Sequence, residues 1–155
     1  MPKIILTRGI QGSGKSTWAK KWVEEDPVHR VRWNNDDFRR MLGSYWVSER
    51  EHLVSIEMSD FIYYAMALGY DIVIDNMNLN KKYWDSIQGR INDYNCEIFV
   101  DDPDKRYTLE FKDFFDVSLE ECIERDSKRE NPIGEKVITK TYDKYKDIIK
   151  ILKKS

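Results

Sequence analysis

The sequence predicts a three-layer α/β domain with a mainly parallel central sheet, and three observations support this prediction. Short apolar runs alternate along the chain with amphipathic segments of helical periodicity. The run Ile72-Val73-Ile74 is apolar without alternation, which is typical of a strand covered by helices on both faces. The segment 9–17, GIQGSGKST, follows the apolar run 4–6 and opens a helical pattern, and it matches the phosphate-binding loop G-x-x-x-x-G-K-[ST].

The expected strands and helices follow from these periodicities and from residues that begin or end helices. Besides 72–74, the predicted strands lie at 3–7 and 31–34. The predicted helices lie at 15–26, from Asp36-Asp37 onward, and at 48–68, 81–94, 119–130 and 135–153. Pro27 ends the first helix, the carboxylates of Asp36 and Asp37 cap free amides of the second, and Ser118 with Glu121 forms a capping box.

The stretch 97–115 has a less distinct pattern. Residues 97–100 and 107–115 both look extended, and the residues between them include Asp101-Asp102-Pro103-Asp104, which is typical of a turn. We therefore predict a β-hairpin in this stretch.

Composition indicates one globular domain spanning 1–155, because 41% of the 155 residues are hydrophobic and 35% are charged. The net charge of −2 argues against a generally basic surface, so any polyanion must be held locally. Most basic side chains, Arg32 among them, are expected to be solvated surface charge. Cys96 and Cys122 lack metal-ligand spacing and are expected to be reduced thiols. Without a membrane-spanning run or a cleavable leader, the protein is predicted to be soluble and cytoplasmic, without membrane contact.

The phosphate-binding loop predicts that the chain binds ATP or another nucleoside triphosphate. Glycines let the backbone curl around phosphate oxygens, and amides of the loop and of the following helix point at the anion. We expect Lys15 to reach the β- and γ-phosphates and Ser16 to ligate Mg²⁺. The predicted nucleotide-binding residues of the loop are Gly9, Gln11, Gly12, Ser13, Gly14, Lys15, Ser16 and Thr17.

The carboxylates of Asp36, Asp37 and Asp75 fall at the carboxyl ends of predicted strands, where ligands of open α/β sheets bind. Asp75 could ligate Mg²⁺ or orient a catalytic group, or it could be a structural cap. Asp36 is the candidate that accepts the proton of an attacking hydroxyl, and its alternative role is a simple helix cap. Arg39 lies three residues after Asp36 and could grip an acceptor phosphate or carboxylate, or form an ion pair at the helix start.

Two further groups of residues have both a functional and a structural interpretation. Arg125 and Arg129 are four residues apart, so they project from one helix face. They could belong to a lid that supplies charge to the transferred phosphoryl group, or they could complement the helix dipole. The aromatic residues near the acceptor carboxylate could stack on a base, although such residues are more often core; they are Trp33, Phe38, Tyr45 and Trp46.

Beyond the phosphate loop, the chain resembles the kinase domain of the bacteriophage-type polynucleotide 5′-kinase/3′-phosphatase family over nearly its whole length. The matching segments are KIILT at 3–7, GSGKSTWA at 12–19, NDDFR at 35–39, DNMNLN at 75–80, FDV at 115–117 and RDSKR at 125–129. The phosphate loop is common to many kinases, whereas the NDDFR and DNMNLN segments together are specific. Asn35 differs from the basic residue usual in the family, and the stretch 97–115 is longer. Acceptor preference is therefore left open.

The resemblance implies a P-loop kinase fold with a helical lid at about 119–134, and transfer of the γ-phosphoryl group to the 5′-hydroxyl of DNA or RNA. It implies a role in nucleic-acid end repair beside a ligase, and a phage origin. The catalytic residues that it implies are Lys15, Asp36, Arg39, Asp75 and Arg129. Among these, Asp36 is the base, Arg39 holds the acceptor's phosphate and Arg129 contacts the donor phosphates, where Arg125 has a lesser role. No D-x-D-G-T motif is present, so no phosphatase domain is expected.

Two other functions remain open from the sequence alone. One is a small-molecule kinase that acts on a nucleoside, sugar or antibiotic hydroxyl, which the acidic net charge slightly favours. The other is a nucleotide-dependent switch with little turnover, in which a dedicated base and acceptor clamp would have no purpose. Transfer assays with oligonucleotides and free nucleosides separate these functions.

Overall fold

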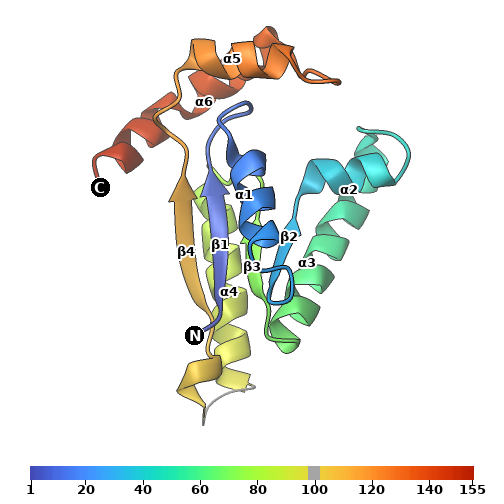
Figure 1. Cartoon of the computed structure of the whole chain (residues 1–155), viewed down its shortest axis with the longest axis vertical. Helices are drawn as coiled ribbons and strands as arrows, with labels where there is room; N and C mark the ends of the chain where they lie inside the picture. The colour runs from blue at the N-terminus through green and yellow to red at the C-terminus, as the bar shows by residue number, and fades with distance from the viewer. Residues whose placement is uncertain (98–101) are drawn as a thin grey trace.

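The computed structural model describes residues 1–97 and 102–155, and its centre is a parallel sheet with the strand order β2-β3-β1-β4 (Figure 1). The strands are β1 (Lys3–Arg8), β2 (Arg30–Trp33), β3 (Asp71–Ile74) and β4 (Thr108–Asp113). Each neighbouring pair is parallel, with Ile4 opposite Ile72 in β3 and opposite Leu109 in β4. The predicted α/β architecture with a parallel sheet is therefore confirmed.

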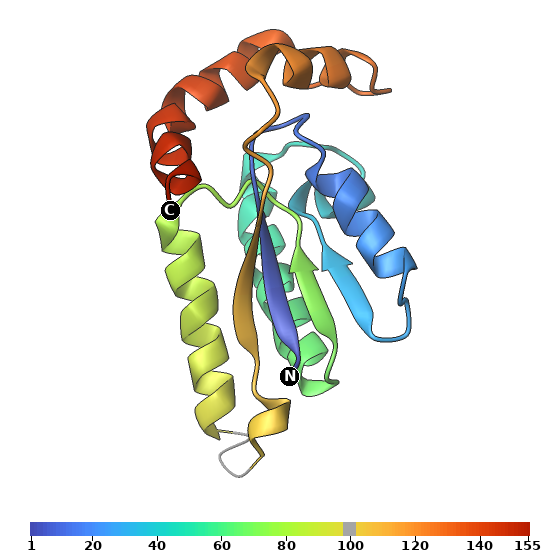
Figure 2. The same ribbon diagram turned by 60° about the vertical axis from the view of Figure 1, so that its left-hand side comes forward.

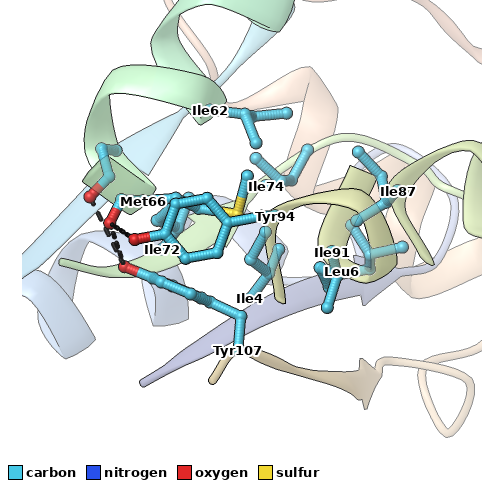
Figure 3. Close-up of a cluster of buried hydrophobic side chains, with 11 residues drawn as sticks. Ile4, Leu6, Ile62, Met66, Ile72, Ile74, Ile87, Ile91, Tyr94 and Tyr107 are labelled. Atoms are coloured by element: carbon cyan, nitrogen blue, oxygen red, sulfur yellow. Dashed lines mark hydrogen bonds between the residues drawn. The ribbon is translucent and has the colours of Figure 1, made fainter. Parts of the chain in front are cut away.

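Helices cover the two faces of the sheet unequally (Figures 1 and 2). Helix α1 (Lys15–Glu24) packs on one face, where its Ala19 contacts Ile5 and Val73. Helices α3 (Glu51–Ala67) and α4 (Lys81–Glu97) pack on the other face. This larger core, drawn in Figure 3, takes alternate residues of the strands, because successive side chains of a strand point to opposite faces.

Two buried tyrosines tie the larger core together. The Tyr94 hydroxyl donates to the Met66 carbonyl at 2.9 Å, and the Tyr107 hydroxyl donates to the Tyr70 carbonyl at 2.6 Å (Figure 3 shows both rings). Burial raises the pKa of both phenols, so each remains a hydrogen-bond donor at neutral pH.

The last two helices lie beyond the carboxyl ends of the strands and not against the sheet face (Figures 1 and 2). Helix α5 (Leu119–Ser127) packs against α6 (Glu135–Lys153) in an apolar cluster that includes Ile10, Cys122 and Ile138. The cluster fixes both helices above the loop that follows β1. Within residues 1–97 and 102–155, no helix has the length and apolar content to cross a membrane.

The structure corrects several sequence-based boundaries. The predicted hairpin is wrong, because Glu97 ends α4, Pro103–Lys105 is a 3-10 turn, and β4 pairs with β1 in parallel. Residues 98–100 of that prediction lie outside the described residues. Helix α1 ends two residues before the predicted Asp26, and α5 ends at Ser127, three before the predicted end.

The start of the second helix also differs from the prediction. Helix α2 (Asn35–Met41) is capped by the Asn34 side chain, which accepts a hydrogen bond from the Asp37 amide at 2.8 Å. Asp36 and Asp37 lie in its first turn instead of serving as the cap. The cap prediction failed because Asn34 provides an equally good acceptor two positions before Asp36. A short 3-10 turn, Ser48–Arg50, precedes α3.

Candidate active site

The loop between β1 and α1 has the backbone conformation that its glycines allow. Gly12 and Gly14 have φ angles of 79° and 98°, which are unfavourable for other residues. A Cβ atom at Gly12 would lie 2.3 Å from the carbonyl oxygen of Cys122, so the backbone of α5 rests directly on the loop. Gly14 is the N-cap of α1, and the free amides of the helix start therefore face the concave side of the loop.

Lys15 is buried at the base of this loop. Lys15 is only 8% exposed, and its Nζ donates a hydrogen bond to the Ile10 carbonyl at 2.7 Å. Burial lowers the pKa of Lys15 to about 8, although the nearby Asp75 raises it and Arg129 lowers it further. An anion bound in the loop would favour the charged ammonium and offer it a stronger acceptor than the Ile10 carbonyl.

Asp75 follows β3 and is 1% exposed. Its Oδ2 accepts a hydrogen bond from Arg32 Nε at 2.8 Å and forms an ion pair with Arg32 Nη2 at 2.6 Å. Its Oδ1 is buried without a hydrogen-bond partner in the part of the chain that the structure describes. A buried oxygen of this kind requires a ligand or solvent partner, which a structural cap does not explain.

Arg32 was expected on the surface, and that prediction is wrong. Its side chain is 15% exposed and contacts Asp75 and Asp37, the latter at 2.6 Å. The parallel register places Arg32 beside Val73 in the neighbouring strand, two residues before Asp75. In the predicted strand 31–34, Arg32 lies two positions before the carboxyl end, close to the edge where ligands bind. This position was the signal in the sequence that Arg32 belongs to the site, but it is weak without the strand order.

Asp36 and Arg39 lie side by side on α2, as their spacing predicts. Arg39 Nη1 donates to Asp36 Oδ1 at 2.6 Å, and the Tyr45 hydroxyl donates to the same oxygen at 3.2 Å. Arg39 also makes a two-point contact with Glu51, at the start of α3, which raises the pKa of the guanidinium. Sequence analysis missed Glu51, because nothing in its local pattern indicates the contact. The ion pair between Arg39 and Asp36, which was the structural alternative to a role in acceptor binding, is therefore present. Glu51 adds a second carboxylate to it.

The four aromatic residues near the candidate base divide into two pairs. Trp33 and Phe38 pack together and Trp33 also contacts Phe61, which places this pair against the core. Tyr45 and Trp46 are 45% and 60% exposed, and the Arg39 guanidinium lies 5.2 Å from the Trp46 ring centre. Of these four residues, Tyr45 and Trp46 are therefore the two that are open to stacking on a ligand.

The two lid arginines have different surroundings. Arg129 lies just after α5, 3.9 Å from Asp126, and lines the main cavity. Arg125 forms an exposed pair with Glu121 at 2.8 Å, and its Nη1 lies 3.5 Å from where a Cβ atom at Gly14 would stand. The buried carboxylate of Asp126 accepts hydrogen bonds from the amides of 133 and 134, at 3.0 and 2.9 Å. Asp126, which sequence analysis missed, thereby fixes the turn between α5 and α6.

One cavity of about 660 Å³ borders the loop between β1 and α1, the helices α2, α3 and α4, and the segment that follows α5. The predicted site residues that line it are Gln11, Gly12, Gly14, Lys15, Ser16, Asp36, Arg39, Asp75 and Arg129. Gly9, Ser13, Thr17 and Arg125 do not line it. Ser13 is 2% exposed and its Oγ has no hydrogen-bond partner among the described residues, and the Gly9 amide donates to the Met77 carbonyl, so both belong to the framework of the loop.

The donor set fits Mg²⁺ bound together with a nucleotide. The described ranges contain no group of three or more His, Cys, Asp or Glu side chains that could hold a metal ion. Mg²⁺ commonly binds through one or two protein oxygens together with substrate phosphates and water. Ser16, at the start of α1, and the free Oδ1 of Asp75 are two oxygens in the same cavity, which matches that requirement.

Comparison with known proteins gives a family and a set of relatives. The family described as an AAA domain matches residues 4–151, nearly the whole chain. A protein of Autographa californica nuclear polyhedrosis virus, described as a bifunctional polynucleotide kinase/RNA ligase, is 26% identical over 156 residues. The match covers 92% of this chain but only 21% of the viral protein, so the chain spans about a fifth of that relative.

Solved structures show the same fold. One structure of a Pnkp1/Rnl/Hen1 complex contains a chain that is 26% identical, with a TM-score of 0.61, covering 80% of this chain and 38% of that one. A Pnkp1/Rnl/Hen1 RNA repair complex gives 24% identity and a TM-score of 0.69, covering 99% and 45%. A gluconokinase from Sinorhizobium meliloti 1021 shares 13% identity with a TM-score of 0.53, covering 92% and 74%. The P-loop kinase fold and the resemblance to polynucleotide kinases are confirmed.

Proposed function

The chain belongs to the AAA domain family, and from this premise we propose that it is an ATP-dependent kinase of the 5′-hydroxyl end of DNA or RNA. The observation that carries the proposal is the shared cavity, which holds a phosphate-binding lysine and an aspartate paired with an arginine. A nucleotide-dependent switch needs the lysine but not the pair. The relatives described as polynucleotide kinases support the choice of acceptor.

In this mechanism the loop holds the donor and α2 holds the acceptor. Lys15 and the amides at the start of α1 bind the triphosphate, and Asp36 accepts the proton of the attacking 5′-hydroxyl. Arg39 binds the acceptor's phosphate through the N–H groups of its guanidinium that Glu51 and Asp36 do not engage. Mg²⁺, held by Ser16 and near Asp75, would supply neutralising charge at the β- and γ-phosphates.

Helix α5 and the segment that follows it, up to residue 134, provide the lid in this proposal, with Arg129 on the donor phosphates. Its guanidinium has a weak contact with Asp126, at 3.9 Å, and is therefore available to a more strongly charged partner. Arg125 has the lesser role, because Glu121 already holds it outside the cavity. An arginine in this position stabilises charge as the transition state forms.

A small-molecule kinase is the alternative in this fold. The gluconokinase neighbour, at 13% identity, shares the fold alone, so it gives no support for a sugar acceptor. A role in nucleic-acid end repair, beside a ligase that seals the phosphorylated end, belongs to the polynucleotide proposal. The Rnl and RNA ligase names of the relatives support it.

The test is transfer of labelled γ-phosphate from ATP, with Mg²⁺, to a short oligonucleotide with a 5′-hydroxyl. The same oligonucleotide already phosphorylated at its 5′ end is the matched control, and a mixture of nucleosides and sugars is the second acceptor. We expect label on the 5′-hydroxyl oligonucleotide alone. Label on the small acceptors alone would replace the proposal with a small-molecule kinase.

A further inference from the structure

The cavity continues past Asp36 and Arg39 into the space between α3 and α4. Besides apolar residues of both helices, its lining there includes five polar or basic side chains: Ser55, Ser59, Lys82, Ser86 and Arg90. These five residues are called the α3–α4 track. The residues of α4 in this group are four apart, and so are the two serines of α3, which places each set on one face of its helix.

The charges of the α3–α4 track are free to bind an anion. Lys82 and Arg90 have no acidic partner within residues 1–97 and 102–155, whereas the adjacent Lys81 is paired with Asp85 at 2.7 Å. Arg90 is positioned across the track by Ser59, whose hydroxyl accepts from Nη2 at 2.8 Å. The remaining N–H groups of its guanidinium face no carboxylate in the described chain.

The length of the track exceeds what a single nucleoside needs. Lys82 and Arg90 are eight residues apart, which corresponds to about 12 Å along the helix axis. Serine hydroxyls opposite two cations provide donors for phosphate oxygens and no recognition of base edges. Tyr83, 58% exposed at the same cavity, adds an aromatic surface of the kind on which single-stranded bases stack.

We infer that the α3–α4 track binds the sugar-phosphate backbone of the acceptor strand beyond its 5′-terminal nucleotide, without sequence preference. The inference rests on the proposed polynucleotide kinase function and specifies its substrate as a strand of several nucleotides. Because net charge is −2, this local row of cations is needed to hold a polyanion. The kinase should therefore favour longer acceptors at low salt.

The experiment compares kcat/KM for two acceptors with a 5′-hydroxyl, a nucleoside 3′-monophosphate and an octanucleotide. It is carried out with wild type, Lys82→Ala and Arg90→Ala. We expect the ratio of kcat/KM for the octanucleotide to kcat/KM for the mononucleotide to exceed one in wild type. This ratio should fall about five- to tenfold in each variant. Lys81→Ala, which removes a neighbouring lysine outside the cavity, should keep the wild-type ratio. A ratio of one in wild type, or equal losses on both acceptors in the variants, would overturn the inference.

Equilibrium binding separates failure of the track from failure of the proposed function. A fluorescent octanucleotide is titrated without ATP at several salt concentrations. The slope of log affinity against log salt should become shallower by about 0.7 for each cation removed from a single-strand site. If no acceptor is phosphorylated but these slopes change, the proposed kinase function is wrong, and binding of a nucleic-acid backbone by the α3–α4 track is supported. Unchanged slopes would overturn the track whatever the transfer assay gives.

Discussion

Arg39 and Glu51 are joined by two hydrogen bonds, from Nε to Oε2 at 3.0 Å and from Nη2 to Oε1 at 2.5 Å. A third bond runs from Nη1 to Asp36, so one guanidinium connects α2 to the start of α3. This geometry uses the planar fork of arginine and cannot be reproduced by a lysine ammonium. Arg39 is therefore held in a fixed orientation beside the candidate base before any acceptor binds.

Arg39→Lys should raise the KM for a 5′-hydroxyl oligonucleotide at least about tenfold and leave the KM for ATP nearly unchanged. The charge is kept, but the two-point contacts with Glu51 and with the acceptor phosphate are lost. Steady-state kinetics with each substrate varied in turn measures both values. Arg40→Lys is the matched control, since Arg40 is exposed, its contact with Asp37 is long at 3.3 Å, and its guanidinium otherwise lies 5.1 Å from the Tyr45 ring centre. Equal effects of the two substitutions would contradict the assigned role.

Asp36→Asn should reduce phosphoryl transfer at least about a hundredfold while triphosphate binding stays close to that of wild type. The amide keeps an oxygen for the contacts with Arg39 and Tyr45 but cannot accept the hydroxyl proton. Single-turnover rates and ATP titration give the two quantities. Asp85→Asn makes the same chemical change in an exposed pair with Lys81 and should have little effect. Turnover of Asp36→Asn at the wild-type rate would remove Asp36 from the role of base.

Local patterns were sufficient to predict the parallel sheet, most helices and the phosphate loop. The N-cap at Ser118 is an example, because a side chain that accepts from an amide three residues later depends on adjacent sequence alone. The other half of the predicted capping box is replaced by a contact between the Glu121 carboxylate and Arg125. Contacts between distant segments were not predictable. Arg32 meets Asp75 only because β2 pairs with β3, and Arg39 meets Glu51 only because α3 begins beside α2. The hairpin prediction failed for the same reason, since extended residues do not specify which strand they pair with.

The lowered pKa of Lys15 predicts coupling between nucleotide binding and protonation. With a pKa of about 8, Lys15 of the free protein is about half deprotonated near pH 8, and a bound triphosphate favours the charged form. Binding at pH 8.5 should therefore take up a proton, and affinity should fall as pH rises above 8. Calorimetry in buffers of different ionisation enthalpy measures the uptake. Lys15→Arg keeps a permanent charge and should show none.

The same pKa has a consequence for folding. Between pH 8 and about 10.5 the unfolded chain holds more protons on Lys15 than the folded chain, so this residue makes the folded state more stable as pH rises through that window.

Proton uptake of wild type near zero on nucleotide binding at pH 8.5, or equal uptake in wild type and Lys15→Arg, would contradict the coupling between nucleotide binding and protonation of Lys15.

Arg32→Met should lower the free energy of unfolding by about 3 to 5 kcal/mol, because it leaves the buried carboxylate of Asp75 without its cationic partner. Urea unfolding of Arg32→Met, Asp75→Asn and the double variant forms a cycle that isolates the pair. The double variant should lose less stability than the sum of the single variants, because no uncompensated charge remains once both are replaced. Arg40→Met, which removes an exposed pair with the same Asp37 that Arg32 contacts, should cost less than about 1 kcal/mol. Strictly additive losses around the cycle would mean that Arg32 stabilises the strand independently of Asp75.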